Sequence, residues 1–140
     1  MTVHRIVNPP ELSPATGFAH AVVAAHGRTV YLGGQTAQRP DGSIEGTTLV
    51  EQFGVALRNL SVTLTACGAT TDDLVHLVVY TTDAEQYRQN LRALGAEYRR
   101  YLGKHYPAMA LFEVAGLFDP DALVELVGTA VIPQDRVSDA

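Results

Sequence analysis

The sequence has few of the residues that mark disulfide-bonded, metal-binding or membrane proteins. Its 140 residues include one cysteine, Cys67, and no tryptophan. A single cysteine excludes an intrachain disulfide framework and any multi-cysteine metal site. The apolar runs are strand-length, well short of the ~20 residues that a membrane span needs. The N-terminus lacks a basic region followed by an apolar one, so we expect a cytoplasmic protein without membrane association.

Charge is also sparse. Only 18% of the residues are charged, and the formal net charge is −5. The scattered Lys and Arg residues form no basic stripe that would neutralise phosphates, which argues against a nucleic-acid partner. The sequence lacks a glycine-rich phosphate loop, HExxH, CxxC and GxSxG. No two histidines recur at a helical spacing that would bring both rings to one metal, so we expect neither a metal nor a cofactor.

The apolar residues, in contrast, are numerous and patterned. They make up 46% of the chain, enough for the core of a single domain over residues 1–140. Segment 74–80 is apolar without alternation, which is typical of a strand with both faces covered. Segments 48–67 and 83–102, on either side, have helical period. The order helix, strand, helix predicts parallel neighbours for the central strand.

Both predicted helices carry start and stop signals. Each begins with a capping-box spacing, and each ends before a glycine suited to a left-handed conformation. The residues are Thr48 with Glu51, Asp83 with Gln86, and the glycines Gly68 and Gly103. Cys67 has no cationic neighbour in sequence that would lower its pKa, so it is interpreted as a packing residue rather than a nucleophile. The charged residues of the second helix are interpreted as a solvated face; they are Arg88, Arg92, Glu97, Arg99 and Arg100.

Five further segments are rich in β-forming residues. They are residues 3–7, 18–25, 28–33, 108–114 and 123–132. His26-Gly27 suits a tight hairpin between the second and third of these. Gly33-Gly34-Gln35 marks either a bulge or a close approach to the backbone. Right-handed crossovers then place both helices on one face of a mixed six-stranded sheet.

The other face of this sheet has no cover. Segments 74–80 and 123–132 carry apolar residues that point both ways, and a bare face of that kind exceeds the roughly few hundred Å² of apolar patch that soluble monomers expose. The sequence contains no third layer. We therefore predict an obligate homo-oligomer, in which copies of the chain form a closed ring and pockets lie between subunits.

A series of motifs extends over nearly the whole chain. In order they are Asn8-Pro9-Pro10-Glu11-Leu12-Ser13-Pro14, Gly17-Phe18-Ala19-His20-Ala21-Val22-Val23, Arg28-Thr29-Val30-Tyr31-Leu32-Gly33-Gly34-Gln35, Glu51-Gln52, Asn59-Leu60, Gly68-Ala69, Asp72-Asp73-Leu74-Val75, Pro107-Ala108 and Phe112-Glu113-Val114. Together they resemble the Rid superfamily (reactive intermediate deaminase, YjgF-like). The resemblance implies an α+β, chorismate-mutase-like fold, a trimeric barrel and three clefts between subunits. The best-known members hydrolyse 2-imino or enamine acids to 2-oxo acids and ammonia.

The positions that the resemblance assigns to the cleft have lost their polar side chains. An arginine that holds the substrate carboxylate, just after the Pro-Ala pair, corresponds to Met109. The other matches are tyrosine to Phe18, serine to Gly33, cysteine to Leu111 and glutamate to Val127. A thioether cannot supply the charge-assisted hydrogen bonds of a guanidinium, worth about 1.5–3 kcal/mol each. The pattern indicates an apolar pocket.

The remaining polar candidates are few. They are Gln35, the backbone amides near Gly33 and Gly34, and the carboxylates Glu113 and Glu125. A carboxylate on an apolar strand lies either at a strand end or in a polar cleft. The sequence identifies no catalytic residue. We predict a divergent Rid homotrimer that binds or transforms a small uncharged metabolite in its intersubunit clefts.

Three alternatives stay open from the sequence. The first is an imine or enamine hydrolase (deaminase) in which an arginine such as Arg39 replaces the lost anchor. The second is an endoribonuclease or translation inhibitor, a description applied to some relatives. The third is a structural or chaperone-like trimer with vestigial clefts.

Overall fold

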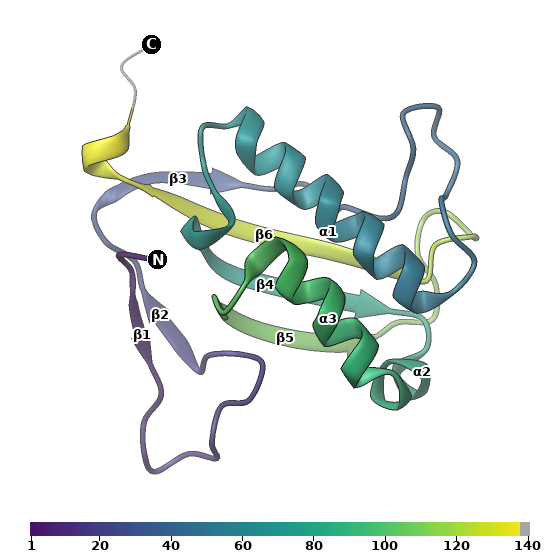
Figure 1. Cartoon of the computed structure of the whole chain (residues 1–140), viewed down its shortest axis with the longest axis horizontal. Coiled ribbons are helices and arrows are strands. Elements are labelled where there is room, and N and C mark those ends of the chain that lie inside the picture. Colours follow the sequence, from purple (N-terminus) through teal and green to yellow (C-terminus); the bar gives the residue numbers. More distant parts are fainter. Residues whose placement is uncertain (138–140) are drawn as a thin grey trace.

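The computed structural model describes residues 1–137, which fold into a four-stranded sheet with helices on one face and a separate two-stranded sheet (Figure 1). The strands are β1 Arg5–Val7, β2 Ala21–Val23, β3 Gly27–Tyr31, β4 Leu74–Thr81, β5 Ala108–Glu113 and β6 Val124–Pro133. The helices are α1 Leu49–Ala66, α2 Ala84–Gln89 and α3 Leu91–Leu102, with 3-10 turns at Thr71–Asp73 and Gln134–Arg136. None of the helices in this part of the chain has the length and apolar character of a membrane span.

The large sheet has the order β3-β6-β4-β5. β4 and β5 run parallel, while β6 is antiparallel to both β4 and β3. The predicted α+β class, the mixed sheet and the interior position of the 74–80 strand are confirmed. The six strands, however, divide into sheets of four and two instead of forming one sheet.

The predicted hairpin at His26-Gly27 is wrong. β2 pairs with β1, whereas β3 pairs with β6. A two-residue hairpin of the favoured type needs positive φ at its turn, and Gly27 is not among the positive-φ glycines. Gly27 instead allows a close backbone approach, because a Cβ added there would lie 2.0 Å from the Ile132 carbonyl oxygen.

Helix α1 forms as the sequence predicts. The Thr48 Oγ1 accepts a hydrogen bond from the Glu51 backbone N–H at 3.2 Å and donates one to the Glu51 carboxylate at 2.8 Å. Phe53, Leu57 and Leu64 lie on the buried face. Gly68 ends the helix with a φ of 79°. Local capping and one apolar stripe are therefore sufficient to define this element.

Replacing Thr48 with Ala should lower the free energy of unfolding by about 1 kcal/mol, because the N-cap hydrogen bond is lost. Chemical denaturation measures this change. Thr65→Ala is the matched control, since Thr65 is an exposed helical residue whose hydroxyl only bonds back to the Ser61 carbonyl. It should be neutral or slightly stabilising. Equal losses in the two variants would contradict the capping role.

The single helix predicted over 83–102 is interrupted at Asn90. Its start is confirmed, since Asp83 accepts from the Gln86 backbone N–H at 3.0 Å. Asn90 has φ −120° and ψ 25°, and its side-chain amide donates to the Gln86 carbonyl at 2.7 Å. This side chain competes with the regular helical hydrogen bonds. The chain therefore turns between α2 and α3.

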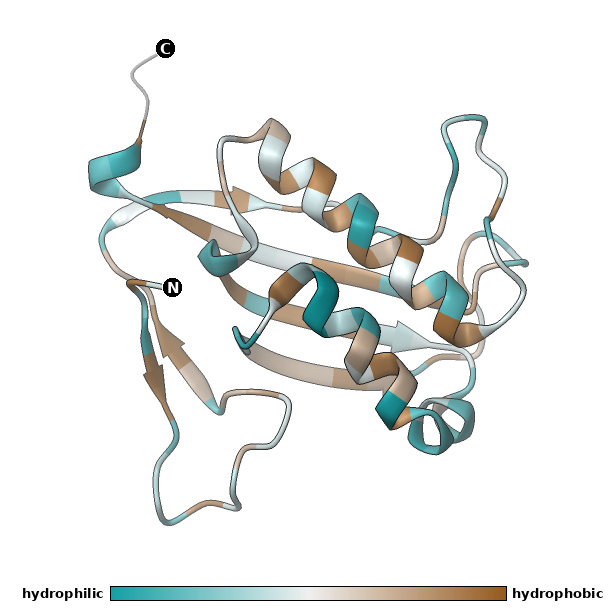
Figure 2. Ribbon diagram, in the orientation of Figure 1, coloured by the Kyte–Doolittle hydropathy of each residue, from teal (hydrophilic) through white to brown (hydrophobic). Residues whose placement is uncertain are grey.

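Cys67 is exposed, so the predicted packing role is wrong. It is the C-terminal cap of α1, where the core is filled by Leu64 and Ala69 instead. Figure 2 shows the corresponding apolar stripes on α1 and α3 and the hydrophobic segments of β4, β5 and β6 beneath them.

The sheet face opposite the helices is largely apolar. Along β4 and β6 the residues that point to the helices are buried, and the alternating residues are partly exposed. By register this second face carries Val78 beside Ala110 and Val127, and Tyr80 beside Phe112. The rings of Tyr80 and Phe112 stack with centroids 6.0 Å apart. Phe112 is 51% exposed.

Candidate functional site

A cavity of about 450 Å³ lies between α3, the edge strand β5 and the loop before β2. Ala19 forms a bridge to Ala108, which brings this loop beside β5. Three of the residues predicted for the site meet here, namely Phe18, Met109 and Leu111. The lining residues are Thr16, Gly17, Phe18, Phe53, Val79, Tyr87, Leu91, Leu94, Gly95, Tyr98, Arg99, Tyr106, Met109, Ala110 and Leu111.

Aromatic rings dominate the wall around Met109. The Met109 sulfur lies 3.8 Å from the Tyr98 hydroxyl, which donates a hydrogen bond to the His105 carbonyl at 2.7 Å. Tyr98 stacks on Tyr106 with ring centroids 5.2 Å apart. Burial, with a contribution from Tyr106, raises the pKa of Tyr98 well above its ordinary value, and burial also raises the pKa of Tyr87. Both phenols are therefore neutral at physiological pH and offer no general base.

A second group of predicted residues lies near the β3 edge of the sheet. Tyr31 pairs with Thr129, but Gln35 pairs with Leu126, so the β3 side contains one extra residue. A bulge at Gly33-Gly34 accounts for this change of register. The second interpretation of these glycines also holds, because a Cβ on Gly34 would lie 2.7 Å from the Glu125 Oε1.

The two candidate carboxylates have different environments. Glu113 lies at the end of β5, where its Oε1 accepts a hydrogen bond from the Ala84 backbone N–H at 3.0 Å. This carboxylate holds the start of α2. Glu125 lies on the open sheet face in register with Tyr80 and is partly exposed. Glu113 is nevertheless exposed, so both carboxylates stay candidates for contact with a ligand.

One chain therefore does not bring all the predicted site residues together. Phe18, Met109 and Leu111 line the cavity beside β5. Gly33, Gly34, Gln35, Glu125 and Val127 lie near the opposite edge, and Val127 is on the open face beside Val78. Among residues 1–137 no group of three or more His, Cys, Asp and Glu side chains could hold a metal ion.

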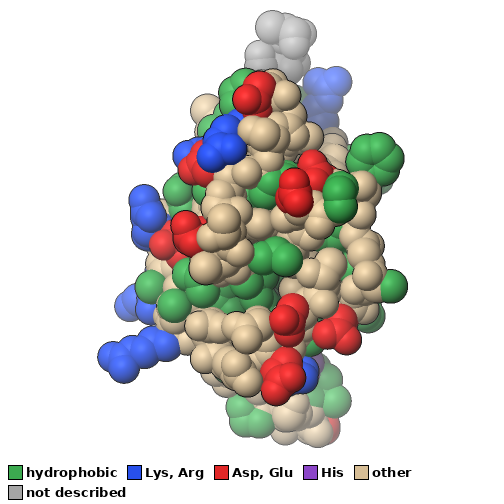
Figure 3. All heavy atoms as spheres, turned by 90° about the vertical axis from the view of Figure 1, so that its right-hand side faces the viewer, with side chains coloured by type: hydrophobic (Ala, Val, Ile, Leu, Met, Phe, Trp, Pro, Cys, Tyr) green, Lys and Arg blue, Asp and Glu red, His purple; other side chains and the backbone are tan. Residues whose placement is uncertain are grey.

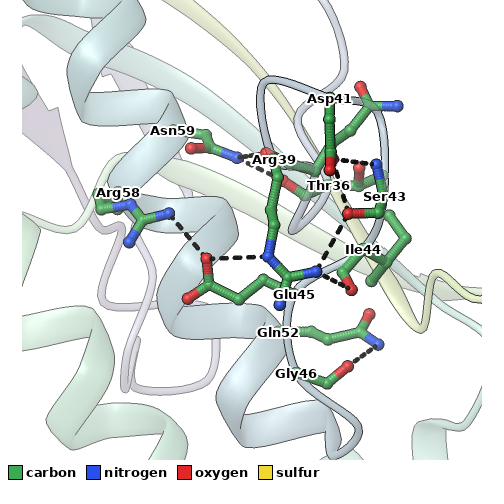
Figure 4. A network of polar contacts seen from close by, with 11 residues as sticks. Thr36, Arg39, Asp41, Ser43, Ile44, Glu45, Gly46, Gln52, Arg58 and Asn59 are labelled. Atoms are coloured by element: carbon green, nitrogen blue, oxygen red, sulfur yellow. Dashed lines mark hydrogen bonds and ion pairs between the residues drawn. The ribbon is translucent and has the colours of Figure 1, made fainter.

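Arg39, the candidate replacement for the anchor, lies away from Met109 within the chain. Its guanidinium donates to the Ser43 hydroxyl and to the Ile44 carbonyl, both at 3.1 Å, and lies 3.9 Å from Glu45 (Figure 4). Arg58 pairs with the same Glu45 carboxylate. Arg39 thus stabilises its own loop beside α1, and it is not among the residues that line the Met109 cavity.

Sequence reasoning missed Arg99, which was assigned to a solvated face. Arg99 is exposed at the C-terminal part of α3 but also lines the cavity. A signal for it existed in the sequence. Gly95 is unfavourable inside a helix, and it precedes Arg99 by one helical turn, the spacing at which two residues share a face.

Comparisons with known proteins agree with this fold. The family model described as Endoribonuclease L-PSP matches residues 9–132. The 2-iminobutanoate/2-iminopropanoate deaminase of Capra hircus is 29% identical over 117 residues, which cover 82% of this chain and 81% of the relative. The human protein of the same name is 26% identical over 117 residues, with the same coverage of both chains.

Solved structures give the same assignment. The conserved Rid-family protein YyfB from Yersinia pestis, described as of unknown function, has a TM-score of 0.83 and 32% identity, covering 92% of this chain and 98% of its own. A YjgF/YER057c/UK114-family protein from Mycobacterium tuberculosis has a TM-score of 0.63 and 28% identity, covering 92% and 99%. The match of the family model over most of the chain, together with these structures, shows that the chain belongs to the Rid (YjgF-like) superfamily.

Proposed function

We propose that this protein is a homotrimer that binds a small molecule with a largely apolar body in clefts between its subunits. In this proposal it is not a deaminase of short 2-imino acids that uses an arginine on β5. The observation that carries the proposal is Met109, which occupies the expected anchor position within an aromatic cavity. A pocket of this character favours apolar ligands with few polar contacts.

The open sheet face supports the trimer. Val78, Val127 and Ala110 form an apolar centre on that face, and the stacked pair Tyr80 and Phe112 extends it. Burying apolar area of this kind against a partner stabilises the assembly by roughly 25 cal/mol per Å². A second copy of the same chain supplies a surface of matching character.

The sheet topology explains why a cleft would need two subunits. The outer strands of the sheet are β3 and β5. In a closed ring, each subunit presents one edge to the opposite edge of the next. The β5 edge, with Met109 and Leu111, would then adjoin the β3 edge of a neighbouring copy, with Gly34 and Glu125. The two separated groups of predicted residues would meet at this junction.

The deaminase alternative has a direct test. Freshly generated 2-aminoacrylate should hydrolyse to pyruvate no faster with the protein than in buffer alone, because Met109 cannot hold the substrate carboxylate. A coupled spectrophotometric assay measures the rate, with the deaminase of Capra hircus as the positive control. If the protein accelerates this hydrolysis and the acceleration is lower in Met109→Ala, the proposal is contradicted and the deaminase alternative is favoured.

The endoribonuclease alternative has little physical support in this chain. Its formal charge of −5 repels a polyanion. On the face that Figure 3 shows, hydrophobic side chains gather toward the middle, and the basic side chains lie mainly along the left edge with acidic ones among them. Phosphate binding requires clustered cations. Binding or cleavage of single-stranded RNA at low salt would contradict this assessment.

A further inference from the structure

The Met109 cavity contains one charged lining residue, Arg99. We propose that its ligand is an organic monocarboxylate with a bulky apolar body, whose carboxylate binds Arg99 while the body fills the aromatic cavity. This inference rests on the proposed function and adds the chemical class of the ligand. It also revises the expectation of an uncharged metabolite, because the cation comes from α3 rather than from β5.

Arg99 has no acidic partner among residues 1–137. Its helical neighbour Arg100 donates to Glu97 at 3.2 Å. Arg58 is paired with Glu45, and Arg136 with Asp73. None of the ion pairs and side-chain hydrogen bonds in this part of the chain includes the Arg99 guanidinium. Within its own chain, such a guanidinium keeps its full fork of donors, and it can bind a ligand carboxylate through two parallel hydrogen bonds.

Gly95 lets the guanidinium lie across the helix at the cavity. A Cβ added to Gly95 would lie 3.1 Å from the Arg99 Nη1, a contact tight enough that the guanidinium would have to shift. Glycine is otherwise unfavourable within a helix. Its presence here gives Arg99 the space to fold back over α3, and both residues line the same cavity.

The rest of the wall suits an apolar body with aromatic or aliphatic carbon. Phe18, Phe53 and Tyr106 contribute ring surfaces. Met109 adds a polarisable thioether, which adapts to varied shapes and contacts aromatic rings favourably. At about 450 Å³ the cavity exceeds what a three-carbon imino acid fills, and it lies within the range of about 300–1,000 Å³ that is typical of small-molecule sites.

The experiment compares two probes of nearly identical shape, 2-naphthoate and 2-naphthamide, by isothermal titration calorimetry on the full-length protein. The carboxylate should bind at least about tenfold more tightly than the amide, since a charge-assisted contact is worth that much or more. Arg99→Gln should abolish this difference, because it weakens the binding of 2-naphthoate and leaves that of 2-naphthamide unchanged. Arg92→Gln is the matched control, because Arg92 is exposed on the same helix but does not line the cavity.

Gly95→Ala is a second test that does not remove the charge. It should keep the fold, as measured by thermal melting, and weaken 2-naphthoate by a smaller factor than Arg99→Gln while leaving 2-naphthamide unchanged. Equal affinities of the two probes in the unmodified protein and in Arg99→Gln would overturn the carboxylate assignment and leave the apolar cavity intact. Failure of both probes to bind would contradict the proposed function itself, and this inference with it.

Discussion

Replacing Val78 with Asp is expected to convert the proposed trimer into single chains. Val78 lies in the middle of the open sheet face, between Ala110 and Val127 on the neighbouring strands. In a ring of three copies, the substitution would bury three carboxylates without partners. Each costs several kcal/mol even after relaxation, by order of magnitude, and all three costs oppose the same assembly.

Sedimentation equilibrium at micromolar concentration measures this effect. The unmodified protein should have three times the 15.0 kDa mass of one chain, and Val78→Asp should approach the mass of one chain. Val62→Asp is the matched control, because Val62 is 63% exposed on α1, away from the sheet. A folded, monomeric unmodified protein would contradict the proposed assembly. If Val78→Asp remains trimeric, the open sheet face is not part of the interface.

Replacing Gln52 with Leu is expected to cost about 3 kcal/mol of unfolding free energy, because three backbone groups lose their partner in a site closed to water. Gln52 is 2% exposed on α1. Its amide donates to the carbonyls of Gly46 and Asp121, at 3.1 and 3.0 Å, and its oxygen accepts from the Leu123 N–H at 2.8 Å. This side chain thus ties the helix to the loops before α1 and before β6.

Urea denaturation followed by circular dichroism measures the loss. Gln38→Leu provides the comparison, because the exposed Gln38 amide makes a single hydrogen bond, to the Gly42 carbonyl. That change should cost less than about 1 kcal/mol. Similar costs at both positions would show that the buried amide is not what connects α1 to these loops.

The parts of the fold that local chemistry determines could be predicted from the sequence. The Thr48 cap, the apolar stripe of α1 and the uninterrupted apolar run of β4 each depend on residues close in sequence. The division of the strands into two sheets could not be predicted in this way. It depends on which partner β2 and β3 find, and β3 pairs with a strand about a hundred residues later.

The break at Asn90 and the exposure of Cys67 were missed for related reasons. Asparagine is found in helices despite its modest propensity, and here its side-chain amide donates to the Gln86 carbonyl at the break. Cys67 is exposed because the chain turns at the end of α1 so that Ala69, whose N–H donates to the Leu64 carbonyl, is buried instead. Neither contact is visible in a hydrophobic pattern.

In the candidate site, too, some residues could be identified from the sequence and others only from the packing. The motifs that resemble the Rid superfamily identified Phe18, Met109 and Leu111, and the structure places all three on one cavity. Glu113, also a candidate, lies outside this cavity and accepts a hydrogen bond from the first residue of α2. Arg99 was missed because charge on an exposed helix is usually solvated, and its relation to the cavity depends on packing of α3 against β5.

The most direct test of the account is whether a ligand reaches Met109. The chain has only two methionines, Met109 in the cavity and the exposed Met1. In protein labelled with ¹³C-methyl methionine, titration with 2-naphthoate should shift the Met109 methyl resonance saturably, through the ring current of the bound probe, and leave that of Met1 in place. A Met109 resonance that does not move at probe concentrations that saturate binding would contradict the account.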